Sequence, residues 1–205
     1  RSLFERLILG KYRSLCLLDL LWTTTNPSEF FQSERIFRRQ TRLSTAGGMM
    51  VAEFLRVYHD LVPDPSSSNL TMREHTTLAS IVEKETGAAH ERPLIAAVFL
   101  NRMKRGMRLE TDPTVIYGIK NFDGNIKRIH LRDGSNPYNT YKIKGLPPGP
   151  IASAGRDALR AILEPADTPY IFFVSRNDGT HIFAETYREH EANVDEFQRK
   201  RRRRR

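Results

Sequence analysis

The clearest pattern in the chain is a helical apolar stripe that carries a carboxylate. Three apolar residues share the spacing of one helix face: Leu78, Ile81 and Val82. Glu85 follows Leu78 by seven residues and points to the middle of this stripe, whereas Glu83 points to the polar side. Because burial disfavours an ionised carboxyl group, Glu85 is expected to hold its proton near neutral pH. Glu85 is therefore the leading candidate for a catalytic acid, with a partly buried ion pair to a neighbouring Lys or Arg as the structural alternative.

Further helices are predicted on both sides of this stripe. Apolar residues at helical spacing predict an amphipathic helix over residues 49–61, followed by a surface linker rich in Pro and Ser. An almost continuously apolar run predicts a buried helix that has Pro93 in its first turn and a C-terminal cap at Gly106. Asp112 before Pro113 is typical of an N-cap that starts a short helix.

The last quarter of the chain predicts a helix, a hairpin and a closing helix. Ser153 is expected to cap the first of these helices. Residues 170–175 predict a buried strand, and residues 181–183 return as its partner after a turn at 177–179. A closing helix is expected over residues 187–198. Because the hairpin follows a run of helices and no βαβ alternation is seen, the order favours an α+β fold over a doubly wound sheet.

Composition and charge narrow the class of protein. The chain has 205 residues, of which 39% are hydrophobic and 28% charged, as in a soluble globular protein. Residues 199–205 supply seven of the nine net positive charges, so the rest of the chain carries only +2. Such a tail is expected to be a solvated end, with an arm for nucleic acid or anionic lipid as the alternative. The lone Cys16 excludes an internal disulfide and a Cys-rich zinc site, and the apolar run 15–22 is too short to span a bilayer.

Few motifs for other chemistries are present. The chain has no phosphate-binding loop and no G-x-S-x-G nucleophile turn. His181 has no second His or carboxylate beside it at metal-ligand spacing, so neither a metal nor a cofactor is expected. Residues 121–135 are polar and contain glycines, which predicts an exposed loop. The polar clusters at residues 111–113, 138–141 and 146–151 are places where a scaffold can present groups to a ligand. Taken alone, each is explained better by a structural role, as a cap, a turn and a stiff bend.

An ordered series of motifs gives these clusters a context. The series consists of LASIVEKET (78–86), NRM (101–103), GMRL (106–109), TDPTVIYG (111–118), YNTY (138–141), GLPPGPI (145–151) and HIF (181–183). In this order, and over about residues 70–198, they resemble the YceG-like family of endolytic murein transglycosylases. Several of the motifs are long, so chance agreement over the whole series is excluded in practice.

The resemblance implies an enzyme of the bacterial cell envelope that acts on peptidoglycan. It would cut nascent glycan strands between N-acetylmuramic acid and N-acetylglucosamine, without water, and leave 1,6-anhydro ends. The catalytic Glu of the family corresponds to Glu85. The resemblance further implies a set of residues that line or support the sugar groove: Asn101, Thr111, Asp112, Asn139, Tyr141, Leu146, Pro147, Gly149 and Ile151. One carboxyl group suffices for this reaction, so Asp112 is not required as the second carboxylate of a hydrolase.

The resemblance also sets expectations about organisation and partners. Residues 49–198 would form the catalytic domain, residues 1–48 an atypical N-terminal segment and residues 199–205 a basic tail. Family members carry an N-terminal membrane helix and a LysM-like subdomain, and residues 1–48 resemble neither. The implied partners are peptidoglycan strands and peptidoglycan synthases, at the periplasmic face of the inner membrane, with membrane contact only through an anchor that this chain does not show. A non-catalytic peptidoglycan-binding protein and a nucleic-acid-binding protein that uses the tail are the alternatives.

Overall fold

The computed structural model describes residues 45–64 and 68–199. The chain divides into two compact units, with the boundary between Ser67 and Ser68. The described part of the first unit contains one helix, α3 (Thr45–Leu61), which begins four residues before the predicted start at residue 49. No helix in the described residues is long and apolar enough to cross a membrane. The expectations for Cys16, for the run 15–22 and for the arginines after residue 199 lie outside the described residues.

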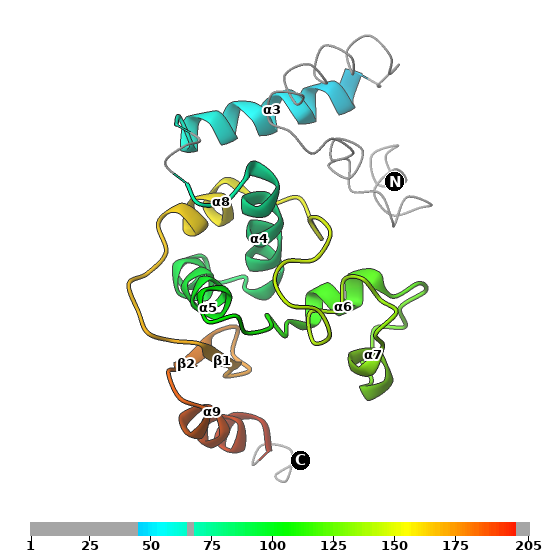
Figure 1. Cartoon of the computed structure of the whole chain (residues 1–205), viewed down its shortest axis with the longest axis vertical. Helices are drawn as coiled ribbons and strands as arrows, with labels where there is room; N and C mark the ends of the chain where they lie inside the picture. The colour runs from blue at the N-terminus through cyan, green and yellow to red at the C-terminus, as the bar shows by residue number, and fades with distance from the viewer. Residues whose placement is uncertain (1–44, 65–67, 200–205) are drawn as a thin grey trace. The chain divides into compact units, whose positions relative to one another are not determined.

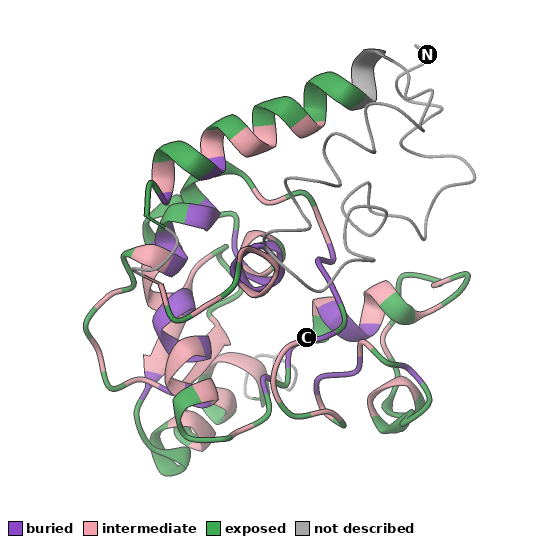
Figure 2. Cartoon of the chain, turned by 45° about the horizontal axis from the view of Figure 1, so that its top comes forward, coloured by how far each residue is buried: buried purple, intermediate pink, exposed green. Residues whose placement is uncertain are grey.

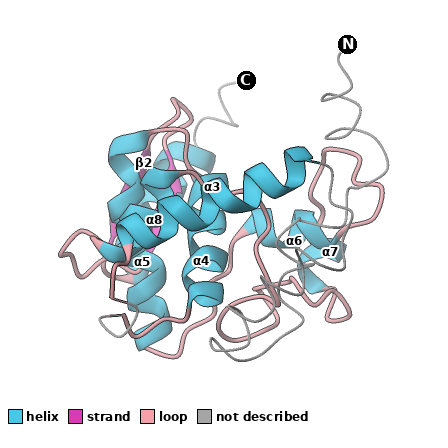
Figure 3. Cartoon of the chain, turned by 90° about the horizontal axis from the view of Figure 1, so that it is seen from above, coloured by secondary structure: helices cyan, strands magenta, loops and turns pink. Residues whose placement is uncertain are grey.

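The second unit is built from short helices followed by one β-hairpin (Figures 1 and 3). Its elements are α4 (Met72–Glu85), η2 (Ala89–Glu91), α5 (Arg92–Lys104), α6 (Asp112–Gly118), α7 (Arg128–Arg132), α8 (Arg156–Leu163), β1 (Phe172–Ser175), β2 (His181–Ala184), α9 (Tyr187–Val194) and the π-helical turn η3 (Asp195–Arg199). This order confirms the α+β class.

Helices α4, α5 and α8 pack against one another and form the core of this unit. Every residue of α4 from His75 to Val82 is buried, and α5 and α8 contribute the buried runs Ile95 to Phe99 and Ala158 to Ile162, in which only Arg160 is exposed (Figure 2). Each large apolar side chain buried in this way stabilises the fold by roughly 1.5–3 kcal/mol. A buried hydrogen bond, 2.9 Å from His75 Nε2 to the carbonyl of Leu159, fixes α4 against α8.

The two ends of α4 are capped in different ways. At the N-terminus, Thr71 and Glu74 form a reciprocal capping box. At the C-terminus the helix stops at Glu85, because Thr86 has an extended backbone with φ −136°. The Thr86 hydroxyl accepts the Ala88 N–H (2.9 Å) and donates to Glu91 Oε2 (3.3 Å). Glu85 is thus the last residue of the central helix.

Helix α5 ends as predicted. Gly106 has φ +67°, its N–H donates to the carbonyl of Met103, and the next N–H, from Met107, donates to the carbonyl of Arg102. This is a Schellman motif, in which a glycine in the left-handed region closes the last helical turn. The chain then turns away toward α6.

Three local predictions differ from the structure. Thr111, and not Asp112, occupies the N-cap position of α6, and Asp112 is the first helical residue. Gly155, and not Ser153, precedes α8, and its N–H donates to Glu83 Oε2 (3.1 Å). Residues 121–135 were expected to be a loop but contain the one-turn helix α7. In the first two cases the residue at the N-cap position has a long-range partner, since Thr111 donates to Glu85 and Gly155 donates to Glu83, and neither helix has a side-chain cap.

The predicted hairpin is confirmed, in the register Phe172 opposite Ala184 and Ser175 opposite His181. The first strand was expected to be buried, but all four residues of β1 are half-buried. Asn177 and Gly179 have positive φ values, 63° and 92°, as a tight connection requires. Strand β1 contacts α5, and α9 contacts both strands, with the rings of Phe172 and His190 stacked at 4.9 Å. The hairpin and α9 therefore extend the unit on the side of α5 (Figure 1).

Arg102 joins the hairpin to the segment that leads into α6. Its guanidinium is buried and donates to the carbonyls of Ile171 (2.7 Å), Leu109 (2.8 Å) and Arg108 (3.1 Å). It also contacts Glu110 Oε2 at 3.3 Å and lies over the ring of Phe172 at 5.2 Å. One side chain thus holds two segments that are far apart in the sequence.

Replacing Arg102 by Met should lower the free energy of unfolding by about 2–4 kcal/mol, because buried carbonyls lose their donor while most of the aliphatic stem remains. Urea denaturation measures this loss. As a control, Lys104→Met at the exposed end of the same helix should change stability by less than about 0.5 kcal/mol. Equal effects of the two substitutions would contradict the bridging role of Arg102.

Candidate active site

The candidate acid, Glu85, stands at the C-terminal end of α4. Its side chain is surrounded by protein on most sides but keeps some exposed surface. Burial raises its pKa to about 7, and the negative charge of Asp112 acts in the same direction. The hydroxyl of Thr111 donates to Glu85 Oε1 and opposes these effects. A negative charge at a helix C-terminus is also unfavourable, which further favours the protonated form.

Glu85 has no cationic partner within the described part of the chain. The ion pair that was the structural alternative for Glu85 belongs instead to Glu83, which contacts Arg92 Nη2 at 3.3 Å and also accepts the Gly155 N–H. The two acids of α4 therefore have separate roles. Glu83 ties α4 to α5 and α8, while the carboxyl group of Glu85 is left to Thr111.

A group of buried threonines fixes Thr111. The Thr111 N–H donates to Thr140 Oγ1 (3.0 Å), and Thr114 Oγ1 donates to the Thr111 carbonyl (2.8 Å). The hydroxyls of Thr114 and Thr140 are 2.8 Å apart, and all three threonines are at most 2% exposed. Just before them, Glu110 has a left-handed backbone with φ +54°, which costs a non-glycine residue roughly 1–2 kcal/mol. Since Arg102 and Thr140 hold Glu110 in place, this strain is maintained beside the acid.

Asp112 and Tyr141 form a second polar pair next to Glu85. The Tyr141 hydroxyl donates to Asp112 Oδ1 at 2.8 Å. Burial and the Asp112 carboxylate raise the pKa of Tyr141, so the phenol remains a proton donor. Asp112 is exposed and does not cap its helix with its side chain. The pair places the Asp112 side chain close enough to raise the pKa of Glu85.

Asn139 was expected to line the sugar groove, but it is fully buried. Its Nδ2 donates to the carbonyls of Asp133 (2.7 Å), His130 (3.1 Å) and Leu131 (3.3 Å) at the end of α7. Its Oδ1 accepts the Tyr141 N–H at 3.0 Å. With no exposed surface, Asn139 has no direct route to a sugar in this conformation, and its hydrogen bonds instead position Tyr141.

The remaining predicted residues support the site from two sides. Asn101 Nδ2 donates to the carbonyls of Thr168 (2.8 Å) and Tyr170 (3.0 Å), which holds the segment leading into β1. In the diproline loop, Ile151 donates its N–H to Ser80 Oγ of α4 at 2.9 Å, and the Pro148 carbonyl accepts from Arg73. The loop residues named by the resemblance differ in exposure, since Leu146 is half-buried while the other three are buried: Pro147, Gly149 and Ile151.

Some residues that shape the site were not predicted. They include Arg102, Thr114 and Thr140, whose roles are described above. Glu91 is a further case. It accepts the His181 N–H at 2.8 Å and lies 2.7 Å from His181 Nδ1. Burial alone would raise the pKa of Glu91, but its hydrogen bonds with His181 and Thr86 lower the pKa below its usual value. This pair holds β2 against the residues that follow Glu85, and the HIF motif was the one signal in the sequence that could have indicated it. No group of three or more potential metal ligands occurs among the residues that the structure describes.

Comparisons with known proteins identify the family of this chain. The chain belongs to the YceG-like family, whose profile matches residues 30–196. It is 40% identical over 123 residues to a Bacillus subtilis (strain 168) protein named endolytic murein transglycosylase, which covers 60% of this chain and 34% of that protein. A Streptococcus pneumoniae (strain R6) protein of the same name is 33% identical over 147 residues, covering 69% and 26%. The chain thus spans about a third or less of these relatives.

A solved structure supports the fold. A crystal structure of a YceG-like protein from Listeria monocytogenes matches with a TM-score of 0.62 and 34% sequence identity, covering 71% of this chain and 46% of that one. The sequence pattern predicts that the catalytic domain starts at residue 49, whereas the family match starts at residue 30. The match also crosses the boundary between the two compact units.

The raised pKa of Glu85 should be visible as a pH-dependent cost to stability. Below pH 4.5 the carboxyl group is protonated in both the folded and the unfolded chain. As the pH rises from 4.5 to 7, the unfolded chain ionises first, so the wild type should lose about 3 kcal/mol relative to Glu85→Gln. Urea denaturation of both proteins across this range measures the difference, and parallel stability curves would contradict a raised pKa.

Two conservative substitutions should shift the pKa of Glu85 in opposite directions. Thr111→Val removes the hydrogen bond that lowers the pKa and should raise it, whereas Asp112→Asn removes a negative charge and should lower it. Both variants keep the side-chain shape, and the Asn side chain can still accept from Tyr141. Titration of the Glu85 carboxyl carbon by NMR measures both shifts. If the two variants shift the pKa in the same direction, the electrostatics described here are wrong.

Proposed function

We propose that this chain acts on peptidoglycan glycan strands as an endolytic murein transglycosylase. It would cleave the bond between N-acetylmuramic acid and N-acetylglucosamine inside a strand and leave 1,6-anhydro-N-acetylmuramic acid ends. The membership in the YceG-like family and the names of the two bacterial relatives support this proposal. The observation that carries it is the state of Glu85, a partly exposed carboxyl group with a pKa of about 7 and no cationic partner among the described residues.

The first step uses Glu85 as a general acid. A carboxyl group with a pKa near the working pH is a good compromise between being protonated and being able to give up its proton. Protonated Glu85 donates to the glycosidic oxygen as the bond to the muramic C1 breaks, and positive charge develops on the sugar ring. The Thr111 hydroxyl then stabilises the carboxylate that forms.

The second step uses the same group as a base. Glu85, now ionised, accepts the proton of the C6 hydroxyl while that oxygen bonds to C1 and closes the anhydro ring. The proton that left Glu85 in the first step is thereby restored, and no water is consumed. A hydrolase would need a second carboxylate to activate water or to form a covalent intermediate. In this chain the nearby carboxylate, Asp112, accepts a hydrogen bond from Tyr141, which supports a role in raising the pKa of Glu85.

The site of action that fits this substrate is the bacterial cell envelope. The resemblance assigns several residues to the substrate, and three of them have side chains that are at least partly exposed: Asp112, Tyr141 and Leu146. We assign direct sugar contact to these three. Asn101, Thr111 and Asn139 we assign to positioning, because their described hydrogen bonds go to protein groups.

Glu85→Gln should fold and lose roughly 10²–10⁴-fold in the rate at which anhydro ends are released from purified peptidoglycan, because Gln cannot transfer the proton. Mass spectrometry of the released muropeptides measures this rate.

The matched control for this experiment is Glu83→Gln on the same helix. It should retain activity, since Gln can still accept the Gly155 N–H. A wild-type protein that binds sacculi and yields no new anhydro ends would be a non-catalytic binding protein. A fully active Glu85→Gln variant would place the acid elsewhere.

A further inference from the structure

The segments that carry Thr111 and Tyr141 have a local excess of positive charge. Residues 101–112 and 138–146 contain six Lys or Arg residues and two Asp or Glu residues, in a chain whose charge outside residues 199–205 is only +2. By contrast, residues 185–196 contain five acids and one base. The near-neutral total therefore hides a strong segregation of charge.

Five exposed cations on these two segments form what we call the cationic rim: Lys104, Arg105, Arg108, Lys142 and Lys144. Within residues 45–64 and 68–199, none of the five has a carboxylate partner. The sixth cation, Arg102, is buried and paired with Glu110. The rim thus keeps its charge available for a ligand.

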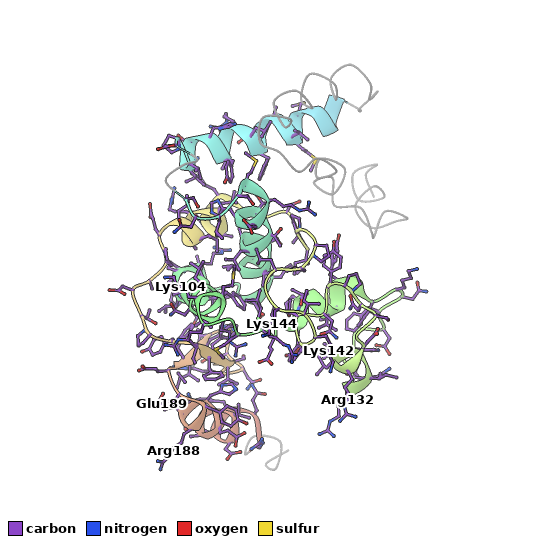
Figure 4. The ribbon with its side chains drawn as sticks, in the orientation of Figure 1. Lys104, Arg132, Lys142, Lys144, Arg188 and Glu189 are labelled. Atoms are coloured by element: carbon purple, nitrogen blue, oxygen red, sulfur yellow. The ribbon has the colours of Figure 1, made fainter. Side chains whose placement is uncertain are left out.

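Backbone hydrogen bonds hold the two segments of the rim together at the site. The Glu110 N–H donates to the Thr140 carbonyl at 3.3 Å, and the Thr111 N–H donates to Thr140 Oγ1. Residues 110–111 and Thr140 therefore lie side by side, next to Glu85. Arg108 comes just before the first of these segments, and Lys142 comes just after the second. Figure 4 shows Lys104 at the end of α5 and Lys142 and Lys144 on the long loop between α7 and α8, whereas Arg188 projects from α9 well away from them.

The rim does not serve the acid itself. Cations close to Glu85 would hold its pKa down, and the pKa is instead raised to about 7. No cation is among the described groups that shift the pKa of Glu85, although the rim lies on the segments that carry Thr111 and Tyr141. Such an arrangement suits a substrate whose neutral sugar lies at Glu85 and whose charged substituents lie to the side.

We propose that the cationic rim binds the carboxylates of the peptide side chains carried by the glycan strand. This inference rests on the proposed function. The peptides hang from the lactyl groups of muramic acid and end in free carboxylates, so every repeat of an internal stretch of strand can present an anion beside the scissile bond. A diphosphate, in contrast, is present only at one end of a strand and lies far from an internal cut. Recognition by several exposed Lys and Arg side chains would raise affinity without affecting the chemical step.

The test compares peptide-bearing strands with strands from which an amidase has removed the peptides. The double substitution Lys142→Gln with Lys144→Gln should raise KM for peptide-bearing strands roughly 3- to 10-fold, with kcat unchanged, as expected for the loss of two exposed ionic contacts. KM for peptide-free strands should stay within about twofold. Raising the salt concentration should weaken wild-type binding of the peptide-bearing strands more than binding by the double variant.

The matched control is Arg188→Gln, which removes an exposed cation on α9 and should leave both KM values unchanged. Equal effects of the double substitution on both kinds of strand, or none on either, would overturn the proposal. An effect seen only with strands that keep a diphosphate end would do the same and would identify that group as the ligand. Single-stranded DNA that binds the rim as tightly as peptide-bearing strands would show a non-selective cationic surface and would also overturn it.

Binding by the Glu85→Gln protein separates this inference from the proposed function. Fluorescence anisotropy with labelled strands measures binding to the rim in the absence of turnover. If the wild type releases no anhydro ends but Glu85→Gln still binds peptide-bearing strands through Lys142 and Lys144, the proposed function fails and the rim stands. If anhydro ends are released and peptides make no difference to binding, the rim fails and the proposed function stands.

Discussion

The contact between the Thr111 hydroxyl and Glu85 is the interaction on which the site depends. It joins the last residue of α4 to the residue that precedes α6. On the α4 side, the helix is fixed by the buried core and by the hydrogen bond between His75 and Leu159. On the other side, Thr111 is fixed by two buried threonines and, through Glu110, by Arg102. Both partners are held independently, so the carboxyl group has a defined position before any substrate arrives.

The same contact has a local cost that the fold tolerates. Thr111 is at the N-cap position of α6, where a threonine hydroxyl normally accepts a backbone N–H, yet no such bond is formed and its hydroxyl is directed to Glu85 instead. Glu110 keeps a left-handed backbone, and Glu85 is partly buried at the unfavourable end of a helix. Three unfavourable features within a few ångströms of one another are typical of a functional site, where strain and a shifted pKa are maintained by the surrounding structure.

Periodicity and local signals predicted the elements well, and long-range contacts explain where they failed. Glu85 was found from its seven-residue offset to Leu78, because a helix face is a local property. In Thr111–Asp112–Pro113 either of the first two residues can cap a helix, and the choice depends on Glu85 and on Tyr141, which is 29 residues away. The partner of His181 is Glu91, 90 residues earlier in the chain. Asn139 occurs in a motif shared with a family of enzymes, but only the structure shows that its amide serves three backbone carbonyls.

Charge placement shows why bulk electrostatics says little about such a site. The excess of cations in residues 199–205 dominates the net charge and suggests nucleic acid, whereas the segments that carry Thr111 and Tyr141 have a local excess that the total conceals. The cations of the rim have no carboxylate partner in the part of the chain that the structure describes. They are compatible with a near-neutral pKa for Glu85 only if they are separated from its carboxyl group by distance or by solvent. The exposed positions of Lys142 and Lys144 satisfy this condition, because water screens them while Glu85 lies among protein groups. The fold thus keeps a proton on one group and positive charge on its neighbours, two states that would exclude each other at closer range.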